Sequence, residues 1–161
     1  MRRFISYKTI LLLMLVLLPS CAPKEYEDIM IGEFPEKYKN YDVLPWEMLE
    51  DERFFAAYEN ILEDFPEDQY LDRYISELYV VASGNRFVTT RQGPFIFSVG
   101  CMPHACTVAR VLVLYDPDRN RVWAYAYDLG VHGRYEVWLG KPNEHIKKLV
   151  DDLDIMIDRR I

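Results

Sequence analysis

The stretch that decides the fold runs from residue 107 to residue 128 and reads TVARVLVLYDPDRNRVWAYAYD. Its first part, residues 107–115, is rich in β-branched and other apolar residues, which is typical of a strand. Turn-forming residues occupy positions 116–120. In residues 121–128, small or β-branched side chains alternate with aromatic ones, as in a strand whose two faces differ. The short turn between the two stretches predicts an antiparallel hairpin.

Further elements lie on both sides of this hairpin. Residues 46–64 have apolar side chains along one side of a helix, and Pro66 suits the first turn of a second helix that runs to about Glu77. Pro142 opens a last helix that ends near Leu153. The remaining strand-like stretches are residues 78–82, 86–90, 95–99 and 135–139. The pattern predicts an α+β domain, with a central antiparallel sheet of about five strands flanked by N-terminal and C-terminal helices.

The N-terminus is typical of an export signal. Arg2, Arg3 and Lys8 precede or adjoin an apolar run at residues 10–18, which is too short to span a bilayer comfortably. The run ends at Leu-Pro-Ser-Cys, residues 18–21, which resembles a lipobox. We therefore expect residues 1–20 to be a lipoprotein signal peptide and Cys21 to carry lipid. The alternatives are an ordinary signal peptide that happens to contain a cysteine, or an uncleaved anchor.

The expected organisation follows from this signal. Ala22 stands where many inner-membrane lipoproteins carry Asp, so the expected location is the outer membrane, with the domain facing the periplasm of a bacterial cell envelope. Residues 21–45 are charged and contain three prolines, which predicts a lipidated cysteine followed by a tether. The folded domain is expected at residues 46–161.

The charge of the chain favours some partners over others. The net charge is −7, and removal of residues 1–20, which carry three of the 19 basic residues and no acid, leaves −10. Such a surface repels nucleic acid and anionic lipid heads and favours a cationic partner. Plain solubility is the alternative explanation of the acidic surface.

The cysteines point to one short loop. Of three cysteines, Cys21 is assigned to lipid, which leaves Cys101 and Cys106 to form a disulfide outside the cytoplasm. The bond would close a six-residue ring, in which Pro103 fixes one backbone angle and His104 lies near the tip. A loop ordered in advance loses less entropy on binding, so the ring is a candidate recognition element.

The loop Cys101-x-Pro103-His104-x-Cys106 resembles the signature loop of the inhibitor of vertebrate lysozyme (Ivy) family. The similarity covers about residues 50–153 and is strongest over 95–140. It includes the strand pair that leads into the loop and the stretch YEVWL at residues 135–139, followed by a helix.

The resemblance implies a non-enzymatic α+β inhibitor domain at residues 46–161, whose loop enters the active-site cleft of c-type lysozyme. The lysozyme-binding loop is then residues 101–106, with His104 as the key inhibitory residue that meets the catalytic carboxylates. Homodimers are known in the family, and no cofactor or metal is implied. The best-known members carry Lys and Asp where this chain has Met102 and Ala105. A methionine at the tip would suit a different lysozyme target, or no lysozyme at all.

Other functions fit the loop less well. A zinc site would need His132 or His145 as additional ligands, because an oxidised cysteine pair does not bind metal. A redox role requires a C-x-x-C spacing that is absent from the sequence. No nucleophile and base are grouped as a hydrolase requires. The main alternative is a non-enzymatic envelope scaffold or binding lipoprotein, in which the disulfide loop is only structural and His104 is a surface residue.

Overall fold

The computed structural model describes residues 29–63, 65, 75–78, 81–130 and 134–158. The expected signal peptide, Cys21, and most of the helix expected at residues 66–77 lie outside these ranges. Within the described part of the chain, no helix has the length and apolar character needed to cross a membrane. The described elements are β1 (Met30–Gly32), the 3-10 helices η1 (Glu36–Tyr41) and η2 (Pro45–Glu50), α2 (Glu52–Leu62), β2 (Val81–Ala82), β3 (Arg86–Thr90), β4 (Gly93–Cys101), β5 (Ala109–Asp116), β6 (Arg121–Leu129), β7 (Arg134–Leu139) and α4 (Glu144–Asp158).

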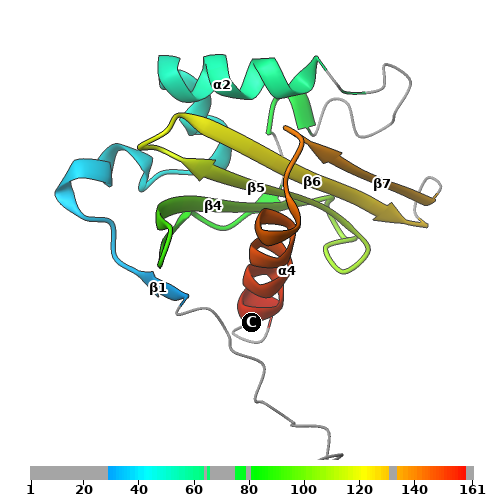
Figure 1. The fold of residues 1–161 in the computed structure, drawn as a ribbon. Coiled ribbons are helices and arrows are strands. Elements are labelled where there is room, and N and C mark those ends of the chain that lie inside the picture. The colour runs from blue at the N-terminus through cyan, green and yellow to red at the C-terminus, as the bar shows by residue number, and fades with distance from the viewer. Residues whose placement is uncertain (1–28, 64, 66–74, 79–80, 131–133, 159–161) are drawn as a thin grey trace, which may run out of the picture.

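The strands form one antiparallel sheet in the order β1-β3-β4-β5-β6-β7, with β2 paired to β4 (Figure 1). The predicted hairpin is its centre, since β5 and β6 pair from Ala109 and Asp128 to Asp116 and Arg121. The α+β prediction is confirmed. The sheet has seven strands rather than about five. The strand that the pattern did not predict is β1, which is only three residues long, whereas β2 lies within the stretch expected at residues 78–82.

Each face of the sheet is covered by its own layer. The helix α2 covers one face and α4 crosses the other (Figure 1). Alternation along β6 directs Val122, Ala124 and Ala126 to the α2 side, and Trp123 and Tyr125 to the α4 side. The two apolar cores that result are separated by the sheet itself.

The helices differ in detail from the prediction. The single helix expected at residues 46–64 is two helices, η2 and α2, because Asp51 has extended backbone and caps α2 by accepting a hydrogen bond from the Phe54 N–H at 2.8 Å. The last helix begins at Glu144 rather than Pro142, since Asn143 accepts from the Ile146 N–H at 2.9 Å. It also continues beyond Leu153 to Asp158.

Residues 29–45, expected to form part of a tether, are part of the fold. The strand β1 pairs with β3, and η1 buries Tyr38 and Tyr41 in the core on the α2 side. The buried amide of Asn85 donates to the Tyr41 carbonyl at 3.1 Å. The folded domain therefore begins well before residue 46.

Gly140, which joins β7 to α4, provides a test of this packing. Its φ is +77°, and a Cβ there would lie 2.5 Å from the Val122 carbonyl oxygen. We expect Gly140→Ala to lower the free energy of unfolding by about 1–3 kcal/mol, through backbone strain and steric overlap. Urea unfolding followed by circular dichroism measures this. Gly32→Ala is the matched control, because a Cβ at Gly32 meets nothing within 4 Å; equal losses in the two variants would contradict the assignment.

Candidate functional site

The cysteine loop connects β4 to β5 at one end of the sheet (Figure 1). Cys101 and Cys106 form the predicted disulfide, with their Cα atoms 4.8 Å apart. Cys101 is also the last residue of β4 and pairs with Arg110 on β5. The Met102 N–H donates to the Ala109 carbonyl at 3.1 Å, which extends the ladder one step into the loop. The ring is therefore held by two strands as well as by its own covalent closure.

The tip of the loop is a tight turn. The Ala105 N–H donates to the Met102 carbonyl at 3.0 Å, which places Pro103 second and His104 third in a β-turn. His104 has a φ of +65°, as the third residue of a type II turn requires. That position favours glycine or asparagine, so histidine here has a conformational cost. Pro103 and His104 are both exposed, and the turn presents the imidazole to solvent.

The residues on either side of the tip are less accessible. Met102 is only 8% exposed, so it lies beneath the turn and does not form the tip that the sequence suggested. Ala105 and Cys106 are half-buried. With Met102 and Ala105 beside it, His104 is the single ionisable side chain of a loop whose base is apolar.

Arg110 ties the loop to the C-terminal helix. Its side chain is 8% exposed, and its Nε donates to the Cys106 carbonyl. Its two terminal nitrogens contact Asp154 and Asp158 of α4, each at 2.6 Å. Sequence reasoning did not identify Arg110 as a site residue. The available signal was a lone charge within the otherwise apolar stretch at residues 107–115.

Among the described residues, the side chains of this link carry more negative than positive charge. One guanidinium faces two carboxylates, so the cluster has a net negative charge. Burial raises the pKa of Asp154 above its ordinary value, an effect that outweighs the opposing charge and hydrogen bond of Arg110. These acids also lie at the negative end of the α4 dipole, where a carboxylate is least favourable without a cation. Arg110 therefore stabilises both the helix end and the loop base.

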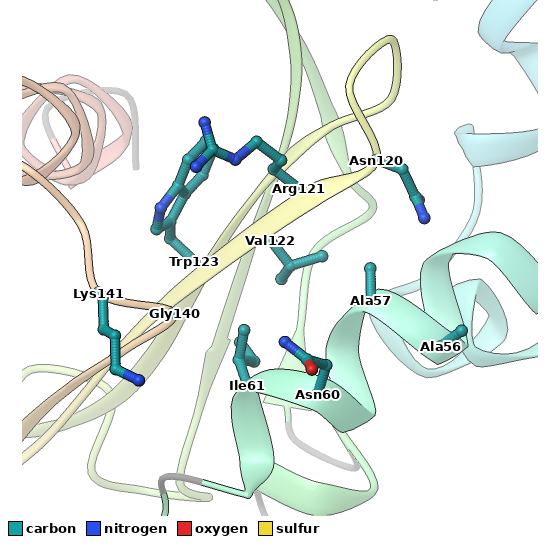
Figure 2. Close-up of a pocket in the computed structure, with 10 residues that line it drawn as sticks. All are labelled: Ala56, Ala57, Asn60, Ile61, Asn120, Arg121, Val122, Trp123, Gly140 and Lys141. Carbon is teal, nitrogen blue, oxygen red and sulfur yellow. The ribbon is translucent and has the colours of Figure 1, made fainter.

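A pocket lies between α2 and the start of β6, beside the β5–β6 turn (Figure 2). Lys141 and Asn60 point toward it, whereas Arg121 extends over the Trp123 ring (Figure 2). None of the described residues that line it carries a carboxylate or an imidazole, so those residues do not provide a pair of groups for acid–base chemistry. Among the described residues, no three His, Cys, Asp or Glu side chains gather as metal ligands. His132, considered above as an additional ligand, lies outside those residues.

The Arg110 link provides a second test. We expect Arg110→Met to lower the free energy of unfolding by roughly 2–4 kcal/mol, less than for a fully buried pair because Asp158 is half-exposed. Amide hydrogen exchange should also increase in residues 102–109 and in the last turn of α4. Lys148→Met is the control, because the Lys148 side chain on the same helix is exposed, so its pair with Asp152 should contribute no more than about 0.5 kcal/mol. Unchanged exchange in the loop would show that Arg110 does not hold it.

Comparison with known proteins identifies a family. The family model described as "Inhibitor of vertebrate lysozyme (Ivy)" matches residues 67–156, which is more than half of the chain and includes the whole cysteine loop. No curated protein matches the chain.

Proposed function

This chain belongs to the family of inhibitors of vertebrate lysozyme, and on that premise we propose that it inhibits c-type lysozyme by inserting the Cys101–Cys106 loop into the enzyme's active-site cleft. The family is one of inhibitors, which agrees with a non-enzymatic role. The loop insertion, the membrane anchor and the role of His104 are the specific parts of the proposal.

The conformation of His104 is the observation that carries this proposal. A histidine with φ of +65° stands exposed at the tip of a loop closed by a disulfide. A purely structural turn would favour glycine at this position. Strained backbone at an exposed, well-supported position is typical of residues kept for binding. We therefore attribute the histidine at this position to the function of its side chain and not to a requirement of the turn.

The chemistry of the target fits an imidazole. Lysozyme uses two catalytic carboxylates in one cleft, one as a general acid and one ionised. A protonated imidazole donates from both ring nitrogens and can therefore bond to both carboxylates at once. Such charge-assisted hydrogen bonds strengthen when the loop excludes water from the cleft. The loop also occupies the space that the polysaccharide substrate needs.

The rest of the molecule supports the same role. The turn and the disulfide order the loop before binding, which reduces the entropy lost in the complex. The net charge of −10 beyond residue 20 attracts a cationic enzyme and raises the association rate. A lipid on Cys21 would hold the inhibitor at the outer membrane, facing the periplasm, where it protects peptidoglycan. A homodimer remains an expectation from the family.

Titration against an animal c-type lysozyme tests the function. The chain from residue 22, which contains every described element, is added to lysozyme that is lysing a suspension of bacterial cell walls. We expect stoichiometric protection, and about tenfold to hundredfold weaker protection by His104→Ala, because a central contact is lost. Gln92→Ala, an exposed residue in the β3–β4 turn, is the control and should inhibit normally. No protection at micromolar excess would exclude inhibition of c-type lysozyme and favour the envelope scaffold.

His104→Gly separates stability from function. Glycine adopts positive φ without strain, so we expect the free energy of unfolding to stay the same or rise by up to about 1 kcal/mol. Inhibition should nevertheless fall as far as in His104→Ala, because the imidazole is absent. Thermal unfolding and the cell-wall assay on the same sample measure both effects. Full inhibition by the glycine variant would assign His104 to the turn alone.

A further inference from the structure

The loop is too small to form a stable interface by itself. Of its six residues, only Pro103 and His104 are exposed, and Thr107 follows just outside the ring. A specific protein–protein interface typically buries about 800 Å² and roughly 20–30 residues on each partner. An inhibitor that inserts this loop must therefore also contact its target with the surface around the base of the loop.

Two exposed aliphatic side chains lie on that surface. Val81 is 53% exposed and pairs with Cys101, the first residue of the ring. Leu129 is 47% exposed, and its N–H donates to the Val108 carbonyl at 2.7 Å. Both are therefore attached by backbone pairing to the segment that supports the loop. Five large apolar side chains are exposed among the described residues, and Val81 and Leu129 are two of them.

Both side chains lie on the same face of the sheet. The register places Val81, Cys101, Arg110 and Tyr127 in one row across β2, β4, β5 and β6. Leu129 is two residues beyond Tyr127 and so returns to that face, which is the face that α4 crosses. Three strand spacings separate Val81 from Leu129 across the sheet, or about 14 Å. The two aliphatic side chains therefore lie on opposite sides of the base of the loop.

The charged side chains that the structure describes between them carry a net negative charge. Arg110 lies in the same row, and its partners Asp154 and Asp158 come from the end of α4. The Asp158 side chain is 49% exposed, so part of the excess negative charge faces solvent. Apolar contacts combined with a charge opposite to that of the partner are typical of a specific interface. A cationic protein surface complements this arrangement.

We propose that Val81, Leu129 and Asp158 form a shoulder that contacts the cationic surface of lysozyme beside its cleft while the loop occupies the cleft. This inference rests on the proposed function and extends it to a second contact area. The loop fixes the orientation, since its base is continuous with β4 and β5. The shoulder adds apolar burial and one surface charge, and it contributes to the choice among lysozymes.

Two double variants with equal charge test the shoulder. Val81→Lys with Leu129→Lys places two cations on it, whereas Phe55→Lys with Met30→Lys places two cations on exposed apolar positions away from the loop. Both change the net charge by the same amount, so long-range attraction to lysozyme changes similarly. Binding of the chain from residue 22 to c-type lysozyme is measured by calorimetry. We expect the shoulder variant to bind at least about tenfold more weakly than the control variant.

The outcomes separate the shoulder from the function itself. Absence of binding by the unsubstituted chain would refute the proposed function. Binding by the unsubstituted chain with equal affinities for the two double variants would refute the shoulder alone. A dimer that becomes monomeric only in the shoulder variant, with no loss of lysozyme affinity, would assign this surface to self-association and would also overturn the inference.

A milder pair of substitutions tests the shoulder if the lysine variant does not fold. Val81→Thr with Leu129→Thr keeps side chains that favour strands but adds a hydroxyl in place of apolar surface. If the lysine variant fails to fold, as judged by circular dichroism, the threonine variant should still fold and bind about threefold to tenfold more weakly. Unchanged affinity of the folded threonine variant would overturn the inference.

Discussion

The burial of β5 on both faces is the constraint on which the rest of the structure depends. All eight residues of Ala109–Asp116 are buried, so this strand needs a covering layer on each side. The helices α2 and α4 supply these layers, one on each face of the sheet (Figure 1). Pairing with β4 and β6 satisfies the backbone groups of the strand, as burial away from water requires. A single strand thus organises the sheet and both cores.

The loop is rigid because this strand holds its base. Its two ends are adjacent in the ladder, because Cys101 of β4 pairs with Arg110 of β5. Arg110 connects the same point to Asp154 and Asp158, so the end of α4 also supports the loop. The disulfide and the turn then fix the few residues that extend beyond the sheet. A short exposed segment on a rigid body is the arrangement that favours insertion into a preformed cleft.

The loop and its surroundings have different tasks in this arrangement. The tip presents an imidazole in a strained turn, while the base is apolar because Met102 is buried. The surrounding surface combines exposed aliphatic side chains with unbalanced aspartates. Residues 101–106 contain no Lys, Arg, Asp or Glu beside His104. Binding by this chain would therefore depend on the histidine and on the surface outside the ring, rather than on other charges within the loop. Because the loop and the surface around its base contribute separately to binding, related loops of different sequence can serve different targets.

The sequence by itself determined the features that depend on local patterns. Alternation along residues 121–128, the turn formers at 116–120 and the paired cysteines specified the central hairpin, the disulfide and the family. Only the tertiary structure decided that residues 29–45 pack on the core and that Met102 lies beneath the turn. Arg110 contacts two aspartates that follow it by 44 and 48 positions in the sequence. The shoulder likewise combines residues of β2, β6 and α4. Hydrophobic periodicity reports which face of an element is buried, whereas the partner across a layer depends on how whole elements pack.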